Sequence, residues 1–332
     1  MQSAGETACL LIGGACVVDD EILRAADRIR EATGCRLAMP TFTGRFRRGG
    51  GLPTPPKVPY FPEDAEKFFA GVQQMILVES QAPCAFFAYP GVESSFVPEG
   101  CVVTTLADFV EDGPDAVGRL AASFPEPPAA EARPPRFLDG ETPTGALTPM
   151  AAAKSLVSLL PPGKQIVLAD ESNTSGLGSM PHWAEGPAHD SINQTGGSIG
   201  IGIPLAVGAA VACPEAKVLC TSSDGSSMYC IQALWTMARE NLNVLTVIID
   251  NGAYAILQGE MTRMADAPMG NAATEMFDLT RPALNFVEIA EGMGVPASMA
   301  KTAEEFHEQA AQAMAMDGPF LIHMCVDGSE FL

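Results

Sequence analysis

The sequence predicts an α/β protein made of two doubly wound parallel-sheet domains. Apolar runs of strand length alternate with amphipathic segments of helix length along most of the 332 residues. One stretch interrupts this alternation, residues 124–145, which is rich in proline, alanine and glutamate and is typical of a linker. We therefore expect a first α/β domain over residues 1–123, a linker over 124–145 and a second α/β domain over 146–332.

Composition and charge exclude several classes of function. Hydrophobic residues make up 47% of the chain and charged residues 18%, which is typical of a globular protein. The formal net charge of -21 argues against nucleic acid and anionic membrane surfaces as partners, because both require a basic patch. The nine cysteines contain no CxxC pair, and we interpret them as small buried side chains in a reducing compartment. No span is typical of a membrane helix or a signal peptide, so we expect a cytoplasmic protein.

The first region opens with a strand–helix–strand pattern. Residues 8–13 and 35–39 are apolar runs, and the segment between them, 21–32, has apolar residues at helical spacing. Gly13-Gly14 resembles part of a nucleotide loop, but GxGxxG is missing, so we expect no nucleotide site here. Further along we expect a glycine- and proline-rich loop over 43–64, a helix over 64–74, strands over 75–78, 85–88 and 101–106, and a helix over 115–123.

The second region continues the alternation. Its strands are expected over 165–169, 218–222, 244–250, 297–300 and 320–326, and its helices over 150–160, 203–213, 228–240, 286–293 and 303–316. We expect irregular structure over 176–194, and a loop or short helix over 262–280. His182 and His189 lie in the irregular stretch and are interpreted as loop histidines, whereas His307 and His323 are interpreted as structural.

Two of these predicted strands end in polar, glycine-containing loops. One apolar run ends in Ser223-Asp224-Gly225-Ser226, and the next ends in Asp250-Asn251-Gly252-Ala253-Tyr254. Asp224 and Asn251 are 27 positions apart, as in one βαβ unit, so both loops should lie at the same sheet edge. A carboxylate and an amide oxygen meeting there suit Mg²⁺, and the helix beginning at Gly225-Ser226 suits phosphate oxygens. Either loop alone is better explained as a helix cap or a turn, but together, at this spacing, they favour a metal site.

These residues carry a resemblance to a known family. The segment GSSMYCIQALWTMARENLNVLTVIIDNGAYAIL resembles thiamine diphosphate (ThDP)-dependent enzymes of the acetolactate synthase and benzoylformate decarboxylase group, and so do IGIPLAVGAAVACPEAKV and the loop DESNTS. The family motif begins GDG and ends NN, whereas this chain has Ser223-Asp224-Gly225 and Asp250-Asn251. The resemblance implies that residues 1–123 correspond to the family's central, Rossmann-like domain and 146–332 to its C-terminal ThDP-binding domain. The family's N-terminal pyrimidine-binding domain has no counterpart here.

The resemblance also implies roles for individual residues. It assigns Mg²⁺ to Asp224, Asn251 and the carbonyl of Ala253, and a substrate pocket to Ile256 and Leu257. Ile199 would be the apolar wedge that bends the cofactor, bringing its own amino group against its thiazolium carbon. The full set of implied cofactor-binding residues is Asn173, Thr174, Gly197, Ser198, Ile199, Gly225, Ser226, Tyr254 and Ala255. The activating glutamate of the family belongs to the N-terminal domain, so no catalytic residue is assigned to this chain.

The expected function is therefore the Mg²⁺- and ThDP-binding portion of an acetolactate synthase-like enzyme acting on 2-oxo acids, by decarboxylation with or without carboligation. The partner would be a second copy of the chain or another chain that supplies a pyrimidine-binding domain. The alternative is a non-catalytic, cofactor-binding or regulatory subunit, since the activating glutamate is missing. A different α/β nucleotide-binding protein is the third possibility. Residues 85–97 contain no histidine, which argues against benzoylformate as the substrate.

Overall fold

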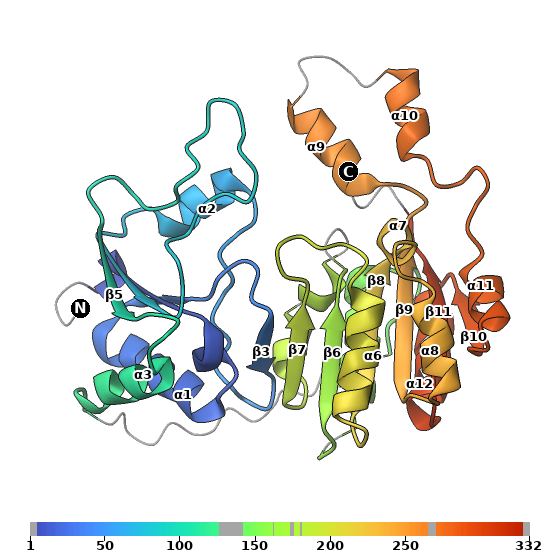
Figure 1. The fold of residues 1–332 in the computed structure, drawn as a ribbon, viewed down its shortest axis with the longest axis horizontal. Helices are drawn as coiled ribbons and strands as arrows, with labels where there is room; N and C mark the ends of the chain where they lie inside the picture. The colour runs from blue at the N-terminus through green and yellow to red at the C-terminus, as the bar shows by residue number, and fades with distance from the viewer. Residues whose placement is uncertain are drawn as a thin grey trace. The chain divides into compact units, whose positions relative to one another are not determined.

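The computed structural model describes residues 5–125, 142–161, 163–172, 176–179, 181–264 and 270–327. The chain divides into two compact units, Met1–Pro134 and Pro135–Leu332. The division lies within the segment 124–145 that the composition predicts to be a linker, of which residues 126–141 lie outside the described residues. Each unit has its own parallel sheet (Figure 1). Each also has its own hydrophobic core.

The first unit is a parallel sheet covered by helices on both faces. Its described residues form a four-stranded sheet in the order β2-β1-β4-β5, and every neighbouring pair is parallel. In chain order the elements are η1 (Gly5–Thr7), β1 (Ala8–Ile12), η2 (Gly14–Val17), α1 (Asp20–Thr33), β2 (Arg36–Ala38), β3 (Arg45–Arg48), α2 (Pro62–Phe69), β4 (Gln74–Val78), β5 (Val102–Ala107) and α3 (Gly113–Ala122).

Successive side chains of the central strand β1 enter opposite layers of the core. Leu10 packs in the cluster that includes side chains of α1 and α3, whereas Leu11 packs in the cluster that includes Phe69 of α2. This alternation follows from the two-residue period of a strand, and burial on both faces explains why β1 is apolar throughout. Asp19 begins α1 by accepting the backbone N–H groups of Glu21 and Ile22, as its position in the sequence predicts.

Two predictions for the first unit are wrong. Residues 85–88 form no strand, because their aromatic side chains pack against other rings rather than into the sheet: Phe86 lies 4.9 Å from Phe42 between ring centroids. The predicted loop 43–64 contains a short strand, β3, in which Phe46 is buried. Arginines flank Phe46 at positions 45, 47 and 48, so hydropathy alone does not predict this strand.

A buried carboxylate occupies the place where a domain of this type would bind a phosphate. Glu79 follows β4, and its carboxylate accepts the backbone N–H of Ala15 (2.5 Å) and of Gly113 (3.2 Å), at the starts of η2 and α3. A Cβ on Gly14 would lie 2.1 Å from Glu79 Oε2, and one on Gly113 would lie 2.7 Å from the same carboxylate. Helix N-termini bind anions, and here the anion is the protein's own side chain. A phosphate group would have to displace it.

We expect Glu79→Ala to lower the free energy of unfolding by about 2–3 kcal/mol, because two backbone N–H groups lose a charged acceptor. Inorganic phosphate should restore part of this loss by binding the vacated N–H groups. Urea denaturation with and without phosphate measures both effects, and Glu66→Ala, which removes an exposed glutamate of α2, is the control. Equal phosphate effects on the two variants would contradict this explanation.

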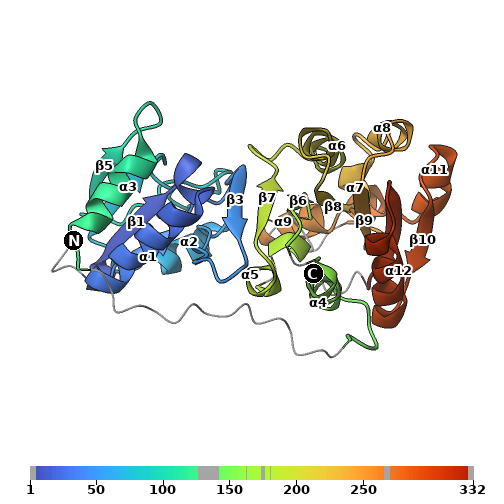
Figure 2. The same cartoon turned by 90° about the horizontal axis from the view of Figure 1, so that it is seen from below.

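The second unit is a wider parallel sheet, with strand order β10-β11-β9-β8-β6-β7. Helices α4 and α12 lie on one face, and α6, α8 and α11 lie on the other (Figure 2). In chain order the elements are α4 (Pro149–Leu159), β6 (Ile166–Asp170), η3 (Leu177–Ser179), α5 (His182–Glu185), β7 (His189–Asn193), α6 (Gly202–Ala212), β8 (Lys217–Ser223), α7 (Asp224–Ser227), α8 (Ala233–Arg239), β9 (Val244–Asp250), α9 (Ala255–Met264), α10 (Asn271–Phe277), α11 (Phe286–Gly292), β10 (Ala297–Ala300), α12 (Ala303–Ala315) and β11 (Phe320–Cys325).

The expected doubly wound α/β class is confirmed in both units, but some elements of the second unit were mispredicted. The helix expected over 228–240 is shorter, because the chain turns after α7 through i→i−3 hydrogen bonds at Tyr229 and Cys230 before α8 begins. Residues 176–194 contain the strand β7, whose sequence HDSIN has no apolar run. It pairs with β6 through its backbone, which hydropathy alone does not reveal. No helix in the described ranges is long and apolar enough to span a membrane.

Lys217 lies at the amino end of β8 and forms hydrogen bonds that hold this end in place. Asp224 follows the other end of the same strand. The Lys217 ammonium group donates to Asn243 Oδ1 (2.6 Å) and to the carbonyl oxygens of Ala313 (3.1 Å) and Met316 (3.2 Å). These bonds tie β8 to the chain before β9 and to the end of α12. Burial lowers the pKa of Lys217 from 10.5 to about 8.

We therefore expect stability to rise with pH between about 8 and 10.5, because the unfolded chain still holds the Lys217 proton in this window while the folded chain does not. The wild type should gain up to about 3 kcal/mol over this window relative to Lys217→Met, which cannot titrate. Urea denaturation at a series of pH values measures the difference, with Lys164→Met, at an exposed lysine, as the control. A difference that stays flat with pH would contradict the prediction.

Candidate cofactor site

Four loops of the second unit follow the carboxyl ends of neighbouring parallel strands. They come after β6, β7, β8 and β9, and in Figure 1 these strand ends point towards α7. The chain passes from β6 to β7 on one side and then returns to β8 on the other side of β6. The ends of β6 and β8 therefore form a topological switch point, which is where open α/β sheets bind ligands.

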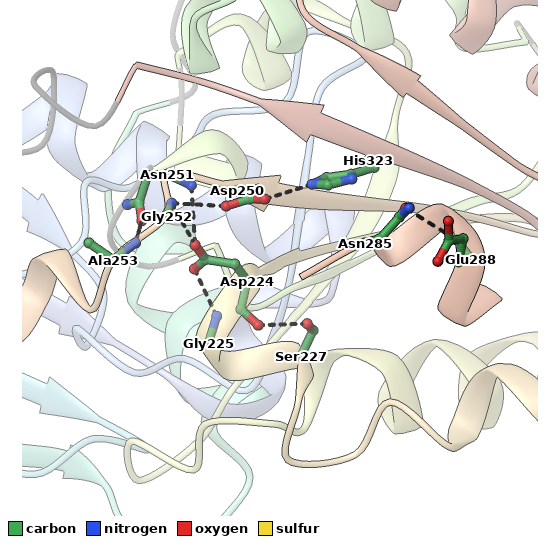
Figure 3. A network of polar contacts seen from close by, with 10 residues as sticks. All are labelled: Asp224, Gly225, Ser227, Asp250, Asn251, Gly252, Ala253, Asn285, Glu288 and His323. Atoms are coloured by element: carbon green, nitrogen blue, oxygen red, sulfur yellow. Dashed lines mark hydrogen bonds and ion pairs between the residues drawn. The ribbon is translucent and has the colours of Figure 1, made fainter. Parts of the chain in front are cut away.

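Asp224 stands at the centre of this edge. Its carboxylate accepts the backbone N–H groups of Gly225 (2.7 Å), Asn251 (3.2 Å) and Gly252 (3.0 Å), as Figure 3 shows. The side chain thus bridges the loops after β8 and β9 across 27 residues of chain. Asp224 is only 3% exposed, so this bridge lies in a largely water-excluded place. The two loops that the sequence predicted to meet do meet.

A second carboxylate gives the site an unfavourable concentration of negative charge. Burial, together with the neighbouring carboxylate of Asp250, raises the pKa of Asp224 to about 7. Burial alone would raise the pKa of Asp250, but the hydrogen bonds with His323 (2.7 Å), with Asp224 and with the Gly252 N–H (2.9 Å) together outweigh it, and this pKa lies below its ordinary value. The partly exposed Asp250 carboxylate is thus held ionised by His323, whereas no side chain among the described residues places a cation against the buried Asp224 carboxylate.

Glu171 fixes the loop that follows β7. Its carboxylate accepts the backbone N–H of Gly202 (2.7 Å) and of Gly200, and the hydroxyl of Ser222 lies 3.3 Å from it. Glu171 is 1% exposed, and burial raises its pKa although the hydrogen bonds to Gly202 and Gly200 oppose this shift. The loop residues 196–200 are therefore held at the start of α6 by a side chain from the end of β6.

Close contacts at two glycines join these loops further. A Cβ on Gly200 would lie 2.4 Å from Cβ of Tyr229, and a Cβ on Gly225 would lie 2.3 Å from the ring of Tyr254. Both glycines are required because another side chain fills the adjoining space. Tyr254 is held in turn from the other side, where its backbone N–H donates to the carbonyl of Phe277 (2.9 Å).

The donor atoms at this edge fit a hard divalent cation. The Asp224 carboxylate and the Asn251 side-chain oxygen are both oxygen ligands, as Mg²⁺ prefers, and Asn251 Oδ1 is oriented by the Ala253 N–H (3.1 Å). A cation would also offset the repulsion between Asp224 and Asp250. The residues present therefore fit the metal that the sequence analysis predicted, on the chemistry and charge of the donor set.

The remaining predicted residues fall into four groups. Ile199, Ile256 and Leu257 are exposed at this edge, with relative exposures of 46%, 39% and 46%. Ala255 is buried at the start of α9. Asn173 and Thr174 lie outside the described residues. The other assigned positions at the carboxyl edge of the sheet are Gly197, Ser198 and Tyr254 in loops, and Gly225 and Ser226 in the short helix α7.

The histidines are placed differently from one another. The His189 ring is buried against Trp183, with 5.5 Å between ring centroids, and its Nδ1 lies 2.9 Å from the carbonyl of Pro187. His182 begins the short helix α5 and is partly buried. His323, interpreted as structural, instead contacts Asp250 directly next to the site. Sequence reasoning missed this pair and the role of Glu171, since neither pairing has a signature in sequence spacing.

Comparison with known proteins identifies the type of domain. Residues 176–324 match the family model described as thiamine pyrophosphate enzyme, C-terminal TPP binding domain. The chain is 44% identical over 328 residues to a Mycobacterium tuberculosis protein that carries the name acetolactate synthase large subunit IlvX, covering 97% of this chain and 62% of that protein. It is also 37% identical over 130 residues to benzoylformate decarboxylase of Pseudomonas aeruginosa, covering 39% of this chain and 23% of that protein.

A solved structure supports the same fold. The Rhodococcus jostii RHA1 thiamine diphosphate-dependent 4-hydroxybenzoylformate decarboxylase matches with a TM-score of 0.73 and 22% identity, over 96% of this chain and 61% of that chain. The present chain thus spans less than two thirds of the length of each of these relatives. Membership in this family implies ThDP and Mg²⁺ as cofactors. Residues 176–324 of the second unit are therefore a C-terminal TPP-binding domain, similar to those of the acetolactate synthase and benzoylformate decarboxylase group.

Proposed function

We propose that the second unit binds the diphosphate of ThDP through a Mg²⁺ ion held by Asp224, Asn251 and the carbonyl of Ala253. The observation that carries this proposal is the bridge between two loops 27 residues apart, in which the Asp224 carboxylate accepts the N–H groups of Asn251 and Gly252. This bridge brings a carboxylate and an amide oxygen together beside a second, partly exposed carboxylate, that of Asp250. Such an arrangement is unfavourable for a protein that binds no cation there.

The surrounding residues supply the other contacts that a diphosphate cofactor needs. Ser226, at the start of α7, would offer its backbone N–H to a phosphate oxygen, Gly225 would let the diphosphate approach closely, and Tyr254 and Ala255 would close the opposite side. Asn173 and Thr174 are assigned to the same diphosphate. Gly197 and Ser198 carry Ile199, whose exposed side chain would bend the cofactor, and Ile256 and Leu257 would line the substrate pocket. Exposed apolar side chains next to a polar loop cluster are typical of a binding site.

The reaction class follows from this cofactor. When bound, ThDP supplies a thiazolium that accepts the electrons released as a 2-oxo acid loses CO₂. We propose that the protein acts on a 2-oxo acid, by decarboxylation with or without joining to a second 2-oxo acid. The names of its relatives, acetolactate synthase and benzoylformate decarboxylase, support this class. The protein's own residues would bind and orient the cofactor and exclude water around it.

The carboxylates that the structure describes at this edge are all engaged in fixing loops. Asp170 accepts the hydroxyl of Thr221 (2.6 Å) and the N–H of Ser172 (3.0 Å), and Glu171 holds the start of α6. We therefore propose that the carboxylate that activates the cofactor comes from a pyrimidine-binding domain on a different chain. The same observation favours the second candidate, a subunit that binds the cofactor without turnover. Assays for CO₂ release from pyruvate, with the purified protein and Mg²⁺-ThDP, distinguish the two.

Asp224→Asn should weaken Mg²⁺-dependent ThDP binding by at least about tenfold, because it replaces a charged ligand of the ion with a neutral one of the same shape. Isothermal titration of ThDP at saturating Mg²⁺ measures the change. Glu288→Gln is the matched control: it removes one negative charge from an exposed position of the same unit, outside the loop cluster (Figure 3). An Asp224→Asn variant with wild-type affinity would rule out the metal assignment.

Ile199→Ala should weaken ThDP binding by about 1–2 kcal/mol, which is roughly 5- to 30-fold, since a wedge loses most of its apolar contact with the ligand. Stability should hardly change, because Ile199 is 46% exposed. Titration calorimetry and thermal unfolding give the two quantities. Val211→Ala, at a 62% exposed apolar position of α6, should change neither the ThDP affinity nor the stability. Similar ThDP affinities of the two variants would contradict the assignment of Ile199 to the cofactor site.

A further inference from the structure

Three metal-binding side chains of different chemistry meet at the ends of β9 and β11. Cys325 is paired with Asp250 in the parallel register, and His323 lies two residues before Cys325 on the same face of β11. One carboxylate oxygen, one ring nitrogen and the sulfur of this trio all lie within 4.8 Å of one another. The closest pair is His323 Nε2 and Asp250 Oδ2, at 2.7 Å. The neighbouring strands β9 and β11 thus place a carboxylate, an imidazole and a thiol close together.

The chemistry of these atoms differs from that of the Asp224 cluster. Thiolate and imidazole ligands select borderline-soft ions such as Zn²⁺ and Co²⁺, whereas Mg²⁺ requires oxygen ligands. Three protein ligands with an open fourth position are a common arrangement for Zn²⁺. The trio is therefore suited to a second kind of ion and does not duplicate the oxygen site beside it.

Burial around the trio also suits an ion. His323 is 2% exposed, and its ring packs edge-on against Phe286 at 5.1 Å between centroids, which fixes its orientation. Asp250 and Cys325 are partly exposed, so an ion can approach from their side and keep a water molecule as its fourth ligand. The second oxygen of Asp250 accepts the N–H of Gly252 (2.9 Å), which orients the carboxylate towards His323.

We propose that Asp250, His323 and Cys325 form a binding site for a divalent transition metal ion of the Zn²⁺ class. The ion would replace the hydrogen bond between His323 Nε2 and Asp250 Oδ2 and bind both atoms and Cys325 Sγ. These two atoms would move apart from 2.7 Å, because each ligand atom lies about 2 Å from a tetrahedral ion. The thiol proton of Cys325 goes to solvent, the ring binds as neutral imidazole with its proton on Nδ1, and any second ring proton also goes to solvent. No oxidation or reduction takes place.

Cobalt tests the site directly, because a cysteine thiolate bound to Co²⁺ gives a charge-transfer absorption band that a carboxylate or imidazole does not. The full chain is stripped of metal with a chelator and titrated with Co²⁺, without ThDP or Mg²⁺. We expect the wild type to bind one Co²⁺ with this band, and Zn²⁺ to displace the Co²⁺ and abolish the band. Since no cofactor is present, failure of this test is distinct from failure of the proposed ThDP function.

Substitutions assign the band to this trio. Cys325→Ser should abolish it and weaken Co²⁺ binding by at least about tenfold. Asp250→Asn should keep the band but weaken binding, because the sulfur remains while one charged ligand is lost. Cys230→Ser, at another partly exposed cysteine of the same unit, should leave both unchanged. A wild type without a thiolate–cobalt band at saturating Co²⁺, or a band that persists in Cys325→Ser, would overturn the proposal.

Discussion

The structure of the second unit depends on one interaction, the acceptance of backbone N–H groups from two loops by the Asp224 carboxylate. This contact brings Asn251 beside Asp224 even though a full strand, helix and strand separate them. It also places a negative charge in a buried position close to Asp250. The two neighbouring carboxylates repel each other, and a bound cation would offset this repulsion. The network of polar contacts continues through Asp250 to His323 on the neighbouring strand. Figure 3 shows this network as one continuous set of contacts.

Both units have a buried carboxylate that accepts loop N–H groups at the carboxyl edge of a parallel sheet, with different consequences. In each case a buried carboxylate just beyond a strand accepts N–H groups from glycine-containing segments of other loops. Glu79 does this in the first unit and fills the place where a phosphate would bind. Glu171 does it in the second unit and holds the loop that carries Ile199. Asp224 differs because its neighbours are oxygen ligands and a second carboxylate, so the same geometry leads to a cation site.

Much of this architecture could be predicted from the sequence, because it depends on local patterns. The strand–helix alternation, the cap at Asp19 and the loops that end at Asp224 and Asn251 are all encoded by residues close in the chain. Strand β7 could not be predicted, since its pairing depends on backbone bonds to β6 and its own side chains are mostly polar. The hydrogen-bond partners of Glu79, Glu171 and His323 could not be predicted either, because each contact joins segments that are far apart in the sequence and meet only in the folded sheet. The family resemblance supplied the identity of the cofactor, which spacing alone would have limited to a metal and a phosphate.

The central claim is that Asp224 and Asn251 act on ThDP through one shared Mg²⁺ ion. A double-mutant cycle tests it most directly: ThDP affinity is measured for the wild type, Asp224→Asn, Asn251→Ala and the double variant, at saturating Mg²⁺ and without added divalent cation. If the two residues hold one ion, the double variant binds ThDP little more weakly than either single variant in Mg²⁺, and this coupling disappears without the ion. Losses of affinity that simply add in Mg²⁺, or a coupling of the same size without Mg²⁺, would contradict the account.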